Sequence, residues 1–422
     1  MKYDTALRNE TARRIEEIGS ADILVGIPCY NNQETIGHVI RMVTEGLATH
    51  YKDSKSVIVI ADGGSTDDTR EVARDAEIKP WQERVISIYR GVAGKGSALR
   101  SVFEAAKRLD VRVCAMVDSD LRSISPDWVK YLMEPVLEKS YQFVAPVYVR
   151  HKYDGTITNN VVYNLTRALY GKRVRQPIGG DFAISRDLAE YYAEQDVWQT
   201  DVARFGIDIW MTTSAITKGF RVCQSNLGVK IHDVKDPGQH LGPMFCQVLS
   251  ALFALMEQYE GIWRSVSGSK AIETFGFEGG QEPEPVQVNL EGMVDRFKTG
   301  HSQFSPLWRK VFSKKCQGEI DKAAALEAKD FHLPTEAWIK ILYELAATFH
   351  LWKLNRAKLL ETMTPLYLAR VASFVRQSWE MSSEEAERLV EQQAEKFEEQ
   401  KGYLIKVWDE KSAEKDGGGR QA

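Results

Sequence analysis

The sequence predicts an α/β protein with a mostly parallel sheet in its first half and a mainly helical second half. In the first half, short runs rich in Val and Ile alternate with amphipathic segments, which is typical of βαβ units. After about Leu241, apolar residues that include many Trp, Leu and Phe recur at helical spacing instead. Polar or glycine-rich residues follow the predicted strands, at the sheet edge where ligands of parallel sheets bind.

Five buried strands, four helices between them and five later helices are expected from these patterns. The strands are expected at 23–27, 57–61, 85–89, 113–117 and 143–147, and the helices between them at 34–47, 66–76, 97–109 and 126–137. The later helices are expected at 244–259, 336–351, 353–363, 365–379 and 383–399. The segment 276–288 contains three glycines and two prolines, so we expect a connection or a lid there.

Composition places the chain among soluble globular proteins. Of its 422 residues, 43% are hydrophobic and 27% are charged, and the net charge of −4 gives no basic surface for nucleic acid. No apolar run has the length of a membrane span, and the polar N-terminus does not look like a secretory signal. The five cysteines form no Cys-x-x-Cys, so neither a disulfide framework nor a zinc ribbon is indicated. We expect a cytoplasmic protein that binds neither nucleic acid nor membrane.

Asp118-Ser119-Asp120 directly follows the fourth predicted strand. Two carboxylates separated by one residue at a strand end are able to hold a hard divalent cation, Mg²⁺ or Mn²⁺, which would neutralise a diphosphate. Asp-x-Asp is also a common turn sequence, so the motif alone leaves both interpretations open.

Polar groups also follow three other predicted strands. Taken singly, each of these segments could also be an ordinary loop or helix cap. The first runs from Pro28 to Glu34, and the second from Asp62 to Asp68, with a carboxylate suited to a base or ribose and a helix start capped at Thr66. The third, 91–97, fails as a P-loop and as a dinucleotide fingerprint, because it lacks a required glycine of each. It leaves Lys95 before a helix N-terminus, where it suits a phosphate or a ribose.

Taken together, Pro-x-Tyr-Asn, Asp-x-Gly-Ser-Thr-Asp and Asp-x-Asp occur in the order and spacing of GT-A glycosyltransferases, which the chain resembles over about residues 20–235. The resemblance implies a GT-A fold, a nucleoside diphosphate sugar donor, a divalent metal ion and sugar transfer. The residues that it assigns to donor binding are Pro28, Tyr30, Asn31, Glu34, Asp62, Ser65, Lys95, Asp118, Ser119, Gly179 and Gly180.

The later motifs look like those of the retaining enzymes that make mannosylglycerate, glucosylglycerate and glucosyl-3-phosphoglycerate. The chain lacks the Gln-x-x-Arg-Trp of processive family-2 enzymes and carries instead 176–181, 205–209 and 230–232. The resemblance places the metal on Asp120 and His232, and it makes Asp208 catalytic together with Asp120 and Lys95. Asp208 would support an oxocarbenium-like transition state, by analogy with glycosidase carboxylates.

Arg150 and Asp154 resemble an Arg and an Asp, four residues apart, that hold the acceptor in the enzymes making mannosylglycerate. A guanidinium suits a carboxylate because it donates two parallel hydrogen bonds. Asp181 is assigned to the acceptor as well. Arg150 also belongs to an ordinary basic cluster, Arg150-His151-Lys152, and the first strand exit looks more like the enzymes making glucosyl-3-phosphoglycerate. The sugar and the nucleotide therefore stay open.

The expected function is retaining, metal-dependent transfer of glucose or mannose to D-glycerate or a related small hydroxy acid by a homodimer. Alternatives are an inverting family-2 glycosyltransferase with a lipid or polysaccharide acceptor, an enzyme making glucosyl-3-phosphoglycerate, a nucleotidyltransferase and an inactive sugar-nucleotide-binding protein. The domains implied are 1–240 with the donor and metal site, 241–408 as a helical region with an acceptor-side lid and oligomer contacts, and 409–422 as a disordered tail.

Overall fold

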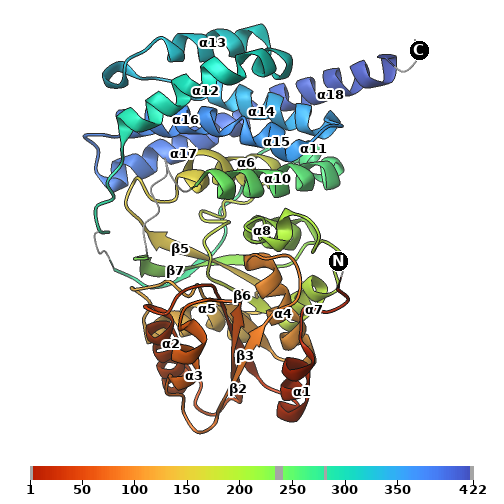
Figure 1. The fold of residues 1–422 in the computed structure, drawn as a ribbon, viewed down its shortest axis with the longest axis vertical. Coiled ribbons are helices and arrows are strands. Elements are labelled where there is room, and N and C mark those ends of the chain that lie inside the picture. The colour runs from red at the N-terminus through yellow and green to blue at the C-terminus, as the bar shows by residue number, and fades with distance from the viewer. Residues whose placement is uncertain (1–2, 233–240, 280–282, 419–422) are drawn as a thin grey trace. The chain divides into compact units, whose positions relative to one another are not determined.

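The computed structural model describes residues 3–232, 241–279 and 283–418, and the chain divides into two compact units (Figure 1). The first unit comprises Met1–Val149, Val174–Asp233 and Ala271–Glu284, and the second comprises Arg150–Arg173, Val234–Lys270 and Pro285–Ala422. This division differs from the single boundary expected at residue 240, because one segment from each expected domain belongs to the other unit.

An eight-stranded sheet forms the centre of the first unit, with the order β3-β2-β1-β4-β6-β5-β7-β8. β6 runs antiparallel to its neighbours β4 and β5, and the other neighbouring pairs are parallel. The expected mostly parallel sheet is thus confirmed. The strands are β1 (Ile23–Cys29), β2 (Ser56–Asp62), β3 (Gln82–Ile88), β4 (Val113–Met116), β5 (Phe143–Val149), β6 (Phe182–Ser185), β7 (Val222–Val229) and β8 (Thr274–Gly276).

Helices cover both faces of this sheet, with α2 and α3 on one side and α1, α4 and α7 on the other (Figure 1). The first-unit helices are α1 (Asn9–Ile18), α2 (Ile36–His50), α3 (Thr69–Asp75), α4 (Lys95–Arg108), α5 (Pro126–Lys139), α7 (Arg186–Ala193), η2 (Asp201–Ala203) and α8 (Ile207–Thr217). The helix expected from Thr66 begins three residues later. Asn31 Oδ1 accepts the backbone N–H of Thr66 over 2.9 Å, which holds Thr66 in the turn.

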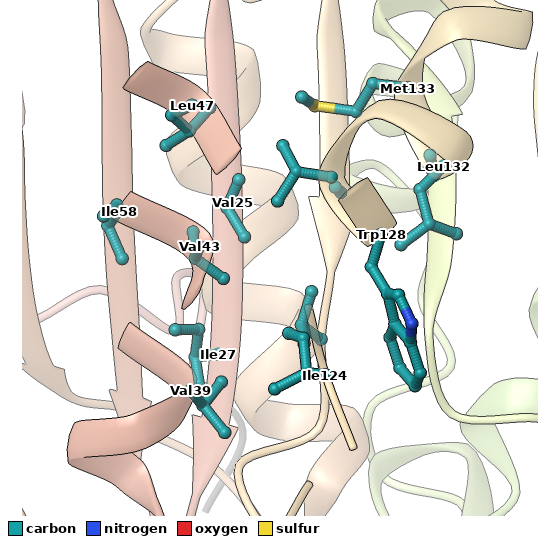
Figure 2. Close-up of a cluster of buried hydrophobic side chains, with 14 of the residues drawn as sticks. Val25, Ile27, Val39, Val43, Leu47, Ile58, Ile124, Trp128, Leu132 and Met133 are labelled. Carbon is teal, nitrogen blue, oxygen red and sulfur yellow. The ribbon is translucent and has the colours of Figure 1, made fainter. Parts of the chain in front are cut away.

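The core of the first unit lies between the sheet, α2 and α5 (Figure 2). Val39, Val43 and Leu47 recur every four residues, so they share the face of α2 that packs against β1 and β2. Trp128, Leu132 and Met133 of α5 extend the same cluster. Because β1 and β2 are buried along their whole length, their sequences are largely continuous apolar runs rather than alternating ones. This rigid layer carries the loops at the carboxyl edge of the sheet.

The second unit is helical, as expected. Trp263, Trp308, Trp338 and Trp408 are among its largest fully buried side chains, so these aromatic residues form core. Among the described helices, none combines the length and apolar character that crossing a membrane requires. The helices are η1 (Thr158–Val162), α6 (Tyr163–Tyr170), α10 (Gly242–Gln258), α11 (Glu260–Ser265), α12 (Leu290–Val311), α13 (Lys314–Ala324), η3 (Ala328–Asp330), α14 (Thr335–Leu351), α15 (Arg356–Glu361), α16 (Thr364–Gln377), α17 (Ser383–Glu399) and α18 (Lys401–Gly418).

Two expectations about segment boundaries differ from the structure for visible reasons. Residues 150–173 join the helical unit, because the buried guanidinium of Arg167 pairs with Glu391 and Glu398 of α17. The tail expected from Asp409 is helical as far as Gly418, and residues 419–422 lie outside the described part. An ion pair of 2.6 Å between Asp409 and Arg264 holds the start of that segment.

Candidate active site

The carboxyl edge of the sheet brings Asp118 and Asp181 together. Asp118 follows β4, and Asp181 immediately precedes β6. Because β6 runs antiparallel, with Phe182 opposite Met116, its first residue lies at the edge where β4 ends. The backbone N–H of Asp118 donates to Asp181 Oδ1 over 2.7 Å. The antiparallel strand thus brings a further carboxylate to the Asp-x-Asp motif.

Two lysines hold the Asp118 side chain from either side. Lys95 Nζ lies 2.8 Å from Asp118 Oδ1, and Lys230 Nζ lies 3.0 Å from Asp118 Oδ2. Lys95 is the first residue of α4, and Lys230 directly follows β7. Both carboxylate oxygens of Asp118 are therefore engaged by cations within the first unit.

These ion pairs set the charges of the site. Burial by itself would raise the pKa of Asp118, but Lys95 and Lys230 outweigh burial and hold that pKa well below the usual range of an aspartate. Burial would lower the pKa of Lys95, yet Asp118 and Asp208 keep it above the ordinary value of a lysine. Asp118 is thus a carboxylate and Lys95 an ammonium at neutral pH.

Asp208 lies in the first turn of α8, as the sequence predicts, and is almost completely buried. Its Oδ2 is 3.4 Å from Lys95 Nζ, whereas no group among the described residues hydrogen-bonds its buried Oδ1. Burial raises the pKa of Asp208, and the charge of Asp118 adds to this effect, while Lys95 offsets only part of it. A buried carboxyl with a raised pKa and an unsatisfied oxygen beside a lysine is typical of a catalytic group.

The first turn of α4 is held in place by close contact with the segment around η2. The N–H of Gly96 donates to the carbonyl oxygen of Arg204 over 3.2 Å, and a Cβ at position 96 would lie 1.8 Å from the carbonyl oxygen of Val202. Only glycine permits this approach. Gly96 stands where a P-loop has Ser or Thr, and its role here is to let the chain before α8 lie against the helix that carries Lys95.

The first strand exit presents one exposed aromatic side chain. Tyr30 is 59% exposed, whereas Pro28 is buried within β1 and Glu34 is exposed. Asn31 has a φ of 54°, a conformation that asparagine tolerates better than most residues. The hydroxyl of Ser119 donates to Asn32 Oδ1 over 2.8 Å, which joins this exit to the Asp-x-Asp motif.

The Asp62 carboxylate, which the sequence assigns to donor binding, is engaged inside its own turn. The side chain is fully buried, and its Oδ2 accepts the backbone N–H groups of Gly64 at 2.9 Å and Ser65 at 3.1 Å. The hydroxyl of Ser65, which is also buried, donates to Asp62 as well. Asp62 and Ser65 therefore hold the turn after β2.

Asp181, expected at the acceptor, is likewise buried. Its Oδ2 accepts the Tyr148 hydroxyl and lies 3.0 Å from Lys230 Nζ. The Asp181 side chain therefore holds both the backbone of Asp118 and the ammonium group of Lys230 in place. Gly179 and Gly180 precede it, and their carbonyl oxygens accept hydrogen bonds from Lys230 and Lys95 respectively.

Asp120 and His232 lie on neighbouring segments. Leu121 forms an antiparallel bridge with His232, and the N–H of Arg122 donates to the carbonyl oxygen of Ile231 over 2.9 Å. Carboxylate and imidazole together suit Mn²⁺, and Mg²⁺ also takes a carboxylate. In the described ranges, no three His, Cys, Asp or Glu side chains form a metal site by themselves. In their chemistry, the Asp120 carboxylate and the His232 imidazole are therefore compatible with a divalent ion.

Arg150 and Asp154 belong to the second unit. Arg150 Nη1 lies 3.2 Å from Asp154 Oδ2, and both side chains are half-buried. The neighbouring Lys152 donates to the carbonyl oxygens of Ser378, Trp379 and Met381 at 2.7, 2.9 and 2.6 Å. Burial, with the charge of Lys152, lowers the pKa of His151, so this histidine is neutral at pH 7. Within this basic cluster, Lys152 is thus engaged by backbone carbonyl oxygens, and Arg150 is paired with Asp154.

Comparison with known proteins identifies the family. Residues 24–189 match the model described as glycosyl transferase family 2. Protein RfbJ of Shigella flexneri is 32% identical over 122 residues, which cover 28% of this chain and 82% of RfbJ. The chain belongs to glycosyl transferase family 2. The expected GT-A glycosyltransferase is thereby confirmed. The family match includes Lys95, Asp118 and Asp181, whereas Asp208, Lys230 and His232 of this glycosyltransferase lie beyond it.

Solved structures of glucosyl-3-phosphoglycerate synthase from Mycobacterium tuberculosis are similar to part of this glycosyltransferase. The complex of that enzyme with Mn²⁺, UDP and glucosyl-3-phosphoglycerate is 26% identical with a TM-score of 0.44, covering 57% of this chain and 83% of that chain. Its complex with Mg²⁺ and UDP is 25% identical with a TM-score of 0.43, at the same coverage.

The sequence-based assignment missed Lys230 and Tyr148. Lys230 was visible as a lysine two residues before the predicted metal ligand His232, at a strand exit. No local pattern pairs it with Asp118, which is 112 residues away in the chain. Tyr148 lies within β5 and has the appearance of an ordinary strand residue.

Proposed function

We propose that this glycosyltransferase transfers glucose or mannose, with retention of anomeric configuration, from a nucleoside diphosphate sugar to D-glycerate or a related small hydroxy acid. The observation that carries the proposal is the group of Asp118, Lys95 and Asp208, with a buried, unsatisfied Oδ1 on Asp208. Lys95 stabilises negative charge on the departing diphosphate. Asp208 stabilises positive charge that develops on the sugar.

Asp120 and His232 hold the divalent ion, Mg²⁺ or Mn²⁺, in this proposal. The bridge between Leu121 and His232 supports this assignment, because it keeps the two ligand-bearing segments together. When bound, the ion supplies Lewis-acid stabilisation of the leaving diphosphate. Asp118 is held by Lys95 and Lys230, so we assign it to donor orientation rather than to the metal.

The chemistry of Arg150 and Asp154 supports an acidic acceptor without a phosphate. Arg150 suits one carboxylate, and Asp154 suits a hydroxyl donor but repels a phosphate. Lys152 donates to three carbonyl oxygens and His151 is neutral, so neither adds the charge that a phosphorylated acid would call for. This argument favours free glycerate over 3-phosphoglycerate. The expected homodimer stays a prediction.

An inverting family-2 transferase with a lipid or polysaccharide acceptor is the second candidate. The raised pKa of Asp208 favours it, since a carboxyl with a raised pKa also suits a general base. The anomer of the product separates the two candidates.

The test is a panel that crosses UDP- and GDP-linked glucose and mannose with glycerate, glycerol, 3-phosphoglycerate and lactate, with Mg²⁺ or Mn²⁺ and with a chelator. We expect an α-linked product from an α-linked donor by NMR, reaction with glycerate but not glycerol, and no transfer in the chelator. Arg150→Lys should lower kcat/KM for the acceptor by about ten- to a hundredfold while the donor KM stays constant, because lysine loses the bidentate geometry.

Arg388→Lys, at an exposed ion pair with Glu384, is the matched control and should behave as the wild type. A β-linked product would replace the retaining proposal with the inverting one. Equal rates with glycerol and glycerate, or a strong preference for 3-phosphoglycerate, would overturn the acceptor class and leave the donor assignment standing.

A further inference from the structure

The two lysines beside Asp118 make equivalent sets of contacts. Each takes one oxygen of Asp118, one carbonyl oxygen of the glycine pair and one further carboxylate. Lys95 donates to the carbonyl oxygen of Gly180 over 3.3 Å and approaches Asp208 to 3.4 Å. Lys230 donates to the carbonyl oxygen of Gly179 over 2.9 Å and approaches Asp181 to 3.0 Å. Two ammonium groups therefore face the single negative charge of Asp118.

Lys230 is more deeply buried and more tightly hydrogen-bonded than Lys95. The Lys230 side chain is 4% exposed, and its hydrogen bonds to Asp118, Gly179 and Asp181 measure 3.0, 2.9 and 3.0 Å. Its far partner, Asp181, is fully buried and also accepts the Asp118 N–H and the Tyr148 hydroxyl. The Lys95 side chain is 15% exposed, two of its contacts are longer, and its partner Asp208 keeps an unsatisfied oxygen.

Gly180 closes the contact between Lys230 and Asp118. Its φ of 99° is a conformation that residues with a Cβ rarely adopt. A Cβ there would lie 2.0 Å from Asp118 Oδ2 and 3.1 Å from Lys230 Nζ. The absence of this Cβ lets the backbone press against the ion pair.

The charge balance around Asp118 indicates different roles for the two lysines. Three carboxylates, Asp118, Asp181 and Asp208, share two ammonium groups, so the group as a whole is negative. If Lys95 turned to an incoming diphosphate and nothing replaced it, Asp118, whose side chain is only 22% exposed, would remain as a partly buried carboxylate without a counter-charge, which is costly. We propose that Lys230 is the fixed counter-ion of Asp118 and thereby releases Lys95 to bind the diphosphate of the donor. The inference rests on the nucleoside diphosphate donor of the proposed function.

The test compares the binding of UDP and GDP to the wild type and to Lys230→Met by calorimetry, in chelator and then with Mn²⁺. Without Lys230, Lys95 becomes the sole cation on Asp118 and stays there. We expect nucleotide affinity to fall by about tenfold or more, the loss typical of a charged hydrogen-bonding partner, even in chelator. The donor KM should rise and the acceptor KM should stay constant. Lys107→Met, at an exposed ion pair with Glu194, is the control and should bind as the wild type does.

A double-mutant cycle separates this role from a structural one. In an Asp118→Asn background, the neutral amide no longer holds Lys95, so removal of Lys230 should cost much less affinity than in the wild type. Lys230→Gln serves in the same cycle if the Met variant does not fold. Unchanged affinity in the single variant, or an equal loss in both backgrounds, would overturn the inference. If the wild type bound neither UDP nor GDP, the donor class itself would be overturned instead.

Discussion

At the scale of single residues, Asp208 combines burial, a raised pKa and an unsatisfied oxygen. We expect Asp208→Asn to lower kcat by about a hundredfold or more with little change in the donor KM, because the group acts mainly in the transition state. Steady-state kinetics with varied donor measures both parameters. A donor KM that rises as steeply as kcat falls would make Asp208 a ground-state binding residue.

The melting temperature of Asp208→Asn distinguishes a loss of catalysis from a loss of the fold. A carboxyl whose pKa is raised by folding stabilises the protein below its unfolded pKa of about 3.9, and this contribution is lost as pH rises through the folded pKa. Ionised Asp208 therefore lowers stability at pH 7, and asparagine does not ionise. The melting temperature of the Asn variant relative to the wild type should rise between pH 4 and pH 7. A difference that stays constant or falls between pH 4 and pH 7 would contradict this sign.

At the scale of elements, Lys152 stabilises the end of α16 within the second unit. Its ammonium donates to three carbonyl oxygens just beyond the helix, where a cation also interacts favourably with the helix dipole. We expect Lys152→Met to lower the free energy of unfolding by about 1–3 kcal/mol, because three carbonyl groups lose their donor. Chemical denaturation measures the loss. Lys406→Met, at an exposed position of α18, should change stability by less than about 0.5 kcal/mol, and equal effects would contradict the assignment.

At the scale of the whole molecule, the units are discontinuous, so a cut at residue 240 does not separate them. A chain of residues 1–240 would lack β8 and would retain Arg167 and Asn160 without Glu391, Glu398 and Trp338, their partners in the second unit. We expect this fragment to show no cooperative thermal transition, while a chain ending at Gly418 melts as the full protein does. A fragment 1–240 that unfolds cooperatively would show that the first unit needs neither β8 nor those partners.

The sequence by itself determined the elements and the local chemistry. Short apolar runs predicted β1 to β5, helical spacing predicted α10 and α14 to α17, and the strand-exit motifs singled out Lys95 and Asp118. The family resemblance added Asp208, and the structure brings the three side chains together. These features depend on neighbours within one strand or helix, so periodicity and spacing reveal them.

The tertiary structure alone decided how distant segments combine. The reversed direction of β6 brings Asp181 to Asp118, and the exit of β7 brings Lys230 to the same carboxylate from 112 residues away. The burial of Asp62 within its own turn is likewise visible only in the structure. Strand direction, burial and ion pairing follow from packing between segments far apart in the chain, and local sequence carries no record of which distant partner a buried charge will meet.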